Sequence, residues 1–192
     1  LETDRPDLRG SSGVDLPRDV PADLLGDRVV AWEPPERLHE RGFYGQPLRD
    51  REPERNRPGA LQLSLVEAAY LAAEGSLALD SGAESVRERG RAVEGERFDR
   101  RLRVYRALRE RGVVPKTGFK FGADFRTYAD VKSVDELGHS ECLVRVLATD
   151  HAFAPRDLAL DVRLAHGVRK RMVFALVDAD GVSWVSVGRL TP

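Results

Sequence analysis

The chain has 192 residues, of which 41% are apolar, and a formal net charge of −1. This length and composition are those of a globular protein with an ordinary hydrophobic core, arranged as one large domain or two small ones. The single cysteine, Cys142, excludes an internal disulfide and a cysteine-rich metal site, and it favours a reducing compartment. The longest apolar run, Met172 to Val177, is far shorter than the ~20 residues that span a bilayer. We therefore expect a cytoplasmic protein without a membrane anchor or a secretion signal.

The charged residues are distributed unevenly along the chain. Residues 1–95 hold 13 Arg against 19 acidic residues, a net charge of −6, whereas residues 96–192 hold 18 basic and 13 acidic residues, a net charge of +5. Only the second half is electrostatically suited to a polyanion. Solvated charges give similar counts in many globular proteins, so charge alone does not identify the partner.

The first half begins with a segment that is typical of a linker. Residues 1–22 contain Pro, Gly and Ser without hydrophobic periodicity. The opening letters LETDRPD resemble the chain's own end, VSVGRLTP, as the end of a preceding repeat would, although chance explains so short a match equally well.

A small N-terminal α/β domain is expected over residues 23–91. The letters RVVAWE and SLALD predict strands, and PPERLHERG predicts a short helix. Ser64 and Glu67 form the S-x-x-E capping box of a second helix, which Gly75 ends. Nothing in this half has the residue types of a catalyst.

A second α/β domain is expected over residues 96–192. Helical periodicity covers 96–112, strands are predicted in FKFGADFRTYA and HSECLVRVL, and a helix is predicted over 155–170 with Pro155 in its first turn. The letters RMVFALV and VSWVSVGR predict a hairpin around Asp180 and Gly181. Together these elements predict a mixed α/β (α+β) fold.

The predicted helix over 155–170 has two distinct faces. Leu158, Val162, Ala165 and Val168 cluster on one side, while a second side carries Arg163, His166 and Lys170. A lysine in the last turn usually complements the helix dipole. The alternative is that Lys170, held between a helix and an apolar strand, presents its ammonium to a ligand.

Three residue types that are far apart in the chain suit one reaction. Tyr128 ends a predicted strand, with its ring expected near an exposed edge, and His139 begins the next strand. Cleavage of RNA through its own 2′-hydroxyl needs a base, an acid and a cation near the phosphate, and Lys170 supplies the cation. Singly, each residue is more often a packing or surface residue than a catalytic one.

A metal-dependent nuclease is the alternative chemistry. Asp124, Asp130 and Lys132 are its nearest candidates. A D-x-K sequence is frequent by chance, so this signal is weak.

The blocks KTGFKFGADFRTY, HSECLVRVL and DLALDVRLAHGVRKRMVFALVD resemble the catalytic domain of the archaeal tRNA-splicing endonucleases. WEPPERLHERGFYGQP and LQLSLVEAAYLAAEG resemble the N-terminal domain of that family, so the resemblance covers about Leu24 to Pro192. It implies a C-terminal nuclease domain with a mixed sheet and flanking helices. It also implies excision of introns from precursor tRNA at bulge-helix-bulge sites, with 2′,3′-cyclic phosphate and 5′-hydroxyl ends and with neither metal nor cofactor.

The same resemblance assigns roles to the three catalytic candidates. Tyr128 is the general base, His139 is the general acid, and Lys170 stabilises the transition state. A noncatalytic structural subunit of the same complex remains the alternative, because such subunits share the fold. They lack the three catalytic residues, so the presence of these residues in this chain distinguishes the two interpretations.

The resemblance also implies binding residues and partners. Arg163 and Trp184 are expected to stack on RNA bases, and Asp178 and Asp180 are expected to dock onto a neighbouring unit. The implied partners are precursor tRNA and a second unit of the same family, either in a homo-oligomer or as a paired repeat. The chain looks like the C-terminal catalytic repeat of a two-unit form.

Overall fold

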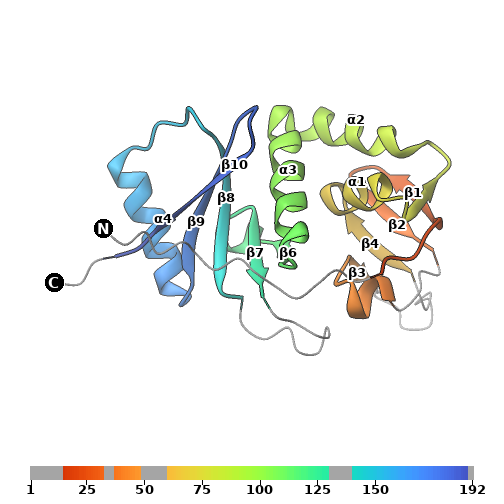
Figure 1. Cartoon of the computed structure of the whole chain (residues 1–192), viewed down its shortest axis with the longest axis horizontal. Coiled ribbons are helices and arrows are strands. Elements are labelled where there is room, and N and C mark those ends of the chain that lie inside the picture. Colours follow the sequence, from red (N-terminus) through yellow and green to blue (C-terminus); the bar gives the residue numbers. More distant parts are fainter. Residues whose placement is uncertain (1–14, 33–36, 49–59, 130–139, 190–192) are drawn as a thin grey trace. The chain divides into compact units, whose positions relative to one another are not determined.

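The computed structural model describes residues 15–32, 37–48, 60–129 and 140–189 (Figure 1). These residues form two compact units, one ending at Leu102 and the other starting at Arg103. Each unit contains a five-stranded sheet with both parallel and antiparallel pairs. The mixed α/β fold predicted from the sequence is therefore confirmed.

The sheet of the first unit has the strand order β3-β4-β2-β1-β5. Its strands are β1 (Val20–Leu25), β2 (Arg28–Ala31), β3 (Gln46–Pro47), β4 (Leu61–Ser64) and β5 (Leu77–Leu79). Strand β1 begins inside the segment that was expected to be a linker. Pro21 suggested a loop, but its carbonyl accepts a hydrogen bond from the amide of Trp32 at 2.9 Å, so it fits in a strand.

Two helices, α1 (Leu65–Ala73) and α2 (Ala83–Glu94), pack together in the first unit, which also contains a short helical turn, η1 (Arg37–Arg41). The predicted capping box of α1 is confirmed, because the Glu67 amide donates to Ser64 Oγ at 3.3 Å and the Ser64 amide donates to Glu67 Oε2 at 3.0 Å. Helix α2 was not expected. Gly90 lies in its middle, where a Cβ atom would come within 2.3 Å of the Phe98 ring.

The sheet of the second unit has the strand order β10-β9-β8-β7-β6. Its strands are β6 (Val114–Thr117), β7 (Phe125–Tyr128), β8 (Cys142–Ala148), β9 (Arg171–Val177) and β10 (Val182–Val187). Strands β8 and β9 are parallel and are connected through helix α4 (Pro155–Gly167). The predicted β9–β10 hairpin is confirmed.

The strand predicted over FKFGADFRTYA is wrong in its first half. Residues Phe119–Phe121 form a 3-10 turn, η3, and β7 starts only at Phe125. Gly122 has φ +64°, the left-handed conformation that glycine adopts at little cost, and this conformation ends the turn.

Helices cover both faces of the second sheet (Figure 1). On one face, Ala165 of α4 joins a buried cluster with Leu143, Met172 and Phe174. The opposite face carries Phe125, whose ring centroid lies 5.9 Å from that of Tyr105 in helix α3 (Glu96–Glu110). This sheet therefore lies between two helical layers.

Candidate functional site

Tyr128 and Lys170 lie at the same end of the second sheet. Tyr128 is the last residue of β7, and Lys170 immediately precedes β9. The intervening strand, β8, pairs Cys142 with both Thr127 and Arg171, so its start is aligned with the end of β7 and the start of β9. Two strand spacings of about 4.8 Å separate the backbones of β7 and β9. This end of the sheet, called here the candidate catalytic edge, carries two of the three predicted catalytic groups.

Both side chains are assigned to the face of the sheet that α4 covers. Arg126 pairs with Leu143, a member of the α4 cluster, and Tyr128 follows Arg126 by two residues, which returns to the same face of a strand. The Lys170 Nζ atom lies 5.9 Å from the ring centroid of Phe121, which packs on the same cluster. The alternation of the strands thus places the phenol and the ammonium on one side.

Lys170 lies outside helix α4, which differs from the predicted helix over 155–170. The helix ends at Gly167, and Arg169 has φ +56°. This left-handed residue turns the chain, and the amide of Lys170 donates to the carbonyl of Ala165 at 2.9 Å. Lys170 therefore leaves the helical face that it was predicted to share with Arg163 and His166.

The ammonium of Lys170 is fixed by a short contact across the edge. Nζ donates a hydrogen bond to the carbonyl oxygen of Ser140 at 2.7 Å, and Ser140 is 4% exposed. An ammonium has three N–H donors. One N–H anchors the side chain, and two further donors remain for a phosphate.

Tyr128 is more buried than the sequence suggested. Only 7% of the residue is exposed, and the guanidinium carbon of Arg126 lies 5.7 Å from the ring centroid. A cation over an aromatic face stabilises the ring in place. The ring is thus buried and in contact with Arg126.

The candidate acid and most of the alternative metal site lie outside the described residues. This applies to His139, Asp130 and Lys132. Asp124 is described, and its Oδ2 accepts the amide of Val146 at 2.8 Å in a buried position. Within the described ranges, no group of three or more His, Cys, Asp or Glu side chains gathers as a metal site would require.

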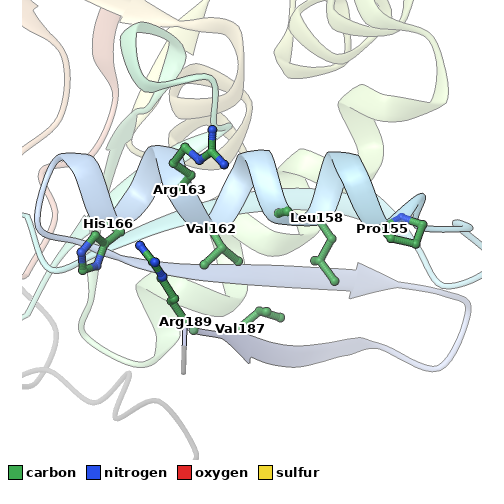
Figure 2. A pocket seen from close by; sticks show the side chains of 9 residues that line it. Pro155, Leu158, Val162, Arg163, His166, Val187 and Arg189 are labelled. Carbon is green, nitrogen blue, oxygen red and sulfur yellow. The ribbon is translucent and has the colours of Figure 1, made fainter. Parts of the chain in front are cut away.

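Arg163 borders a groove of about 490 Å³ between α4 and the end of β10 (Figure 2). Leu158 and Val162 of the helix and Val187 of the strand form its apolar wall, and the guanidinium of Arg189 reaches toward the helix beside His166. His166 was predicted to lie on the polar face of the helix, whereas Arg189 was assigned no role. Arg189 was expected at the end of the strand predicted by VSWVSVGR but follows β10 in the structure, and strand periodicity alone gives a basic residue there no binding role.

Trp184 lies on the other face of the sheet from this groove. It pairs with Ala175, whereas Val187, an odd number of residues away, pairs with Met172 in the α4 cluster. The Arg111 guanidinium carbon lies 5.5 Å from the Trp184 ring centroid. Within this chain, Arg163 and Trp184 are therefore not brought together as one base-stacking pair.

Asp178 builds the turn of the β9–β10 hairpin. Its Oδ1 accepts the amides of Asp180 at 2.9 Å and Gly181 at 3.0 Å, and its Oδ2 accepts the Thr149 hydroxyl at 3.1 Å. These bonds, first that from the Gly181 amide, lower the pKa of the Asp178 carboxyl below its ordinary value. Asp178 is thus committed to its own turn, while Asp180 is exposed beside it.

None of the helices formed by the described residues has the length and apolar content needed to cross a bilayer.

Sequence comparison assigns both halves of the chain to one family. Residues 20–90 match the family profile described as the tRNA intron endonuclease N-terminal domain. Residues 98–184 match the one described as the tRNA intron endonuclease catalytic C-terminal domain.

Curated relatives named tRNA-splicing endonuclease extend this similarity over almost the whole chain. The protein of Natronomonas pharaonis is 66% identical over 193 residues, covering 100% of this chain and 56% of the relative. That of Haloarcula marismortui is 63% identical, covering 100% and 56%, and that of Methanococcoides burtonii is 40% identical, covering 97% and 53%. The chain spans about half the length of these relatives. The chain belongs to the tRNA intron endonuclease family.

Proposed function

We propose that the chain carries the catalytic centre of an endonuclease that excises introns from precursor tRNA at bulge-helix-bulge sites. The observation that carries this proposal is the alignment of Tyr128 and Lys170 on one edge of the sheet, with Ser140, the residue after His139, hydrogen-bonded to Lys170. The family membership and the names of the relatives support the same substrate class. A cytoplasmic location follows as part of this proposal.

The reaction is a transesterification within the RNA. Tyr128 is the general base of this step and acts in it as a phenolate, which becomes a phenol by taking the proton of the 2′-hydroxyl. The O2′ oxygen then attacks the adjacent phosphorus. The bond from phosphorus to O2′ forms as the bond to the 5′-oxygen breaks, and His139 gives that oxygen its proton. The products are a 2′,3′-cyclic phosphate and a 5′-hydroxyl.

Lys170 stabilises the charge that builds on the phosphate during this step. An ammonium pre-positioned by the Ser140 carbonyl needs little reorganisation as negative charge develops on the nonbridging oxygens. The same hydrogen bond ties Lys170 to the chain segment next to His139. A shift of that segment would therefore disturb both groups together.

Arg163 is proposed to contact the RNA from the rim of the α4 groove, where Arg189 and His166 add further nitrogen donors. Trp184, on the opposite face of the sheet, would meet a different part of the substrate or a neighbouring unit. Asp180, exposed at the hairpin tip, is the better candidate for a contact with a second unit of the family, because Asp178 already serves the turn.

Two alternatives are separated by one experiment on the purified protein that contains this chain. A bulge-helix-bulge RNA is incubated in excess chelator, with His139→Ala as the comparison. We expect the wild type to cleave and the variant to bind without cleaving. Cleavage that requires an added divalent ion would favour the Asp124-based metal nuclease, and binding without cleavage by the wild type would favour a noncatalytic subunit.

A further inference from the structure

The most exposed large apolar side chain in the described residues belongs to Phe119, which is 87% exposed. Single exposed apolar residues are common on protein surfaces. Phe119 differs from them in two respects, namely the rigidity of the turn that carries it and the position of that turn beside Lys170.

The turn that carries Phe119 is held by several independent contacts. The Phe121 amide donates to the Gly118 carbonyl at 2.7 Å, and the Gly122 amide donates to the Phe119 carbonyl at 3.0 Å. A Cβ atom on Gly118 would lie 2.9 Å from the Ala123 carbonyl oxygen, so the backbone there is closely packed. The ring of Phe119 is thus presented to solvent from a fixed backbone.

The same turn is packed against the elements of the candidate catalytic edge. The ring centroid of Phe121 lies 5.9 Å from Lys170 Nζ, and a Cβ atom on Gly122 would lie 3.2 Å from a methyl group of Leu164 in α4. Phe121 also packs on the buried cluster beneath α4. Phe119 is therefore two residues from a side chain that contacts the candidate transition-state group.

Cations accompany this exposed ring. Lys120, the next residue in the chain, is exposed, and Lys170 Nζ lies 5.9 Å from the ring centroid of Phe121. Proteins hold single-stranded nucleic acid with exposed aromatic rings that stack on bases and with nearby cations that meet the phosphates, and this turn carries groups of both kinds.

We propose that Phe119 is a stacking platform for an unpaired nucleobase of the RNA substrate next to the scissile phosphate. A base that stacks on this ring would hold its strand beside Lys170, so Phe119 would act as a substrate-positioning residue. This inference rests on the proposed function, because it assumes that the phosphate near Lys170 belongs to RNA.

The test uses a bulge-helix-bulge RNA with a 2′-deoxy nucleotide at the scissile position, which blocks transesterification, and 2-aminopurine at single unpaired positions. Phe119→Ala is expected to weaken binding by about 5- to 150-fold, the range for loss of one base stack, and to abolish the quenching of at least one 2-aminopurine. Phe119→Trp should restore both signals, whereas Phe119→Leu, which keeps apolar bulk without a π face, should not. Leu25→Ala, which truncates another exposed apolar residue (54% exposed) in the first unit, is the control and should bind like the wild type.

Cleavage of the unmodified RNA by the wild type is measured in parallel. If the wild type cleaves and Phe119→Ala binds with unchanged affinity and quenching, the stacking role is overturned and the proposed function stands. If the wild type does not cleave, both are overturned. A loss of binding in Phe119→Ala that coincides with a change in sedimentation would assign Phe119 to a protein interface and overturn the stacking role.

Discussion

Lys170 Nζ donates a 2.7 Å hydrogen bond to the carbonyl of Ser140, joining the residue before β9 to the residue after His139. The bond crosses between segments that are 30 residues apart in the chain. It fixes the position of the cation and gives the carbonyl of a buried residue its partner. One contact therefore has a structural consequence and, under the proposed function, a catalytic one.

Replacing Lys170 by Met should separate these two consequences. The side chain keeps most of its length but loses its charge and its donors, so kcat for RNA cleavage is expected to fall by about 10²–10³-fold with little change in KM. The unpaired Ser140 carbonyl should lower the free energy of unfolding by about 1–3 kcal/mol. Lys170→Arg, which keeps a positive donor, should recover more of the stability than of the rate. A rate equal to the wild type in Lys170→Met would remove Lys170 from the mechanism.

Tyr128→Phe tests the phenol without disturbing its ring. The ring and its contact with Arg126 remain, so stability should change by no more than about 1.5 kcal/mol, while single-turnover cleavage should fall by about 10²–10⁴-fold. The matched control is Tyr105→Phe, which removes a hydroxyl that accepts a hydrogen bond from Arg109 at 2.9 Å on the other face of the sheet. Equal loss of cleavage in both variants would indicate a general effect of removing a tyrosine hydroxyl rather than a catalytic role.

Gly90→Ala should destabilise the first unit. The new Cβ atom would lie 2.3 Å from the ring of Phe98, which is fully buried, and overpacking of this kind costs about 1–3 kcal/mol. Phe98→Leu in the same chain should relieve part of the clash. Gly167→Ala in α4 is the control, because its Cβ atom would have no neighbour within 4 Å and should be neutral or stabilising. Denaturant unfolding measures these differences between the wild type, Gly90→Ala, the double variant and Gly167→Ala. Equal stability of Gly90→Ala and the wild type would show that α2 and α3, which carry Gly90 and Phe98, move apart without cost.

The elements that were not predicted from the sequence depend on contacts between residues that are distant in the chain. The Ser64–Glu67 capping box and the turn at Asp180 and Gly181 were predictable because both are set within four residues. Glycine disfavours the interior of a helix, so Gly90 predicts an interruption. Its close packing against the ring of Phe98 explains why a glycine lies inside α2. Short-range sequence patterns predicted the fold class, whereas packing between distant residues determines where the individual helices and strands begin and end.

The geometry of the candidate site was predicted less well than the fold, and the roles of its residues stay predictions. Sequence periodicity placed Lys170 on the polar face of a helix, but Arg169 has a left-handed conformation, and Lys170 instead bonds Ser140, just before β8. Alternation along β10 could not show that Trp184 faces away from α4, because the register of β10 against β9 sets that face. Phe119 was missed because its alternating neighbours suggested a strand.

The loss of stability of the folded protein at acidic pH should depend in part on Asp178. Its carboxyl has a lowered pKa in the folded state because the Gly181 amide, the Thr149 hydroxyl and the Asp180 amide donate to it. A carboxyl group whose pKa is lowered by folding stabilises the folded state at pH values above its unfolded-state pKa of about 3.9. This stabilisation is lost as the pH falls through the folded-state pKa. Asp178→Asn should therefore be less stable than the wild type at pH 7, and the difference should shrink below about pH 4.

Asp180→Asn is the control for this experiment. It removes the same charge from the same turn but leaves the acceptor of these hydrogen bonds in place. Its thermal stability should follow the wild-type pH profile. A constant difference between Asp178→Asn and the wild type from pH 7 to pH 3 would show that the carboxylate charge does not stabilise the turn.

The most direct test of the central claim is the chemistry of the cut ends in the presence of excess chelator. The purified protein is given two bulge-helix-bulge RNAs that differ only in the 2′-hydroxyl at the nucleotide before the scissile phosphate. If this RNA hydroxyl is the nucleophile and the chain's own side chains move the protons, the normal RNA gives 2′,3′-cyclic phosphate and 5′-hydroxyl ends, and the 2′-deoxy RNA stays intact. Cleavage of the 2′-deoxy RNA, or products with 3′-hydroxyl ends, would contradict the account.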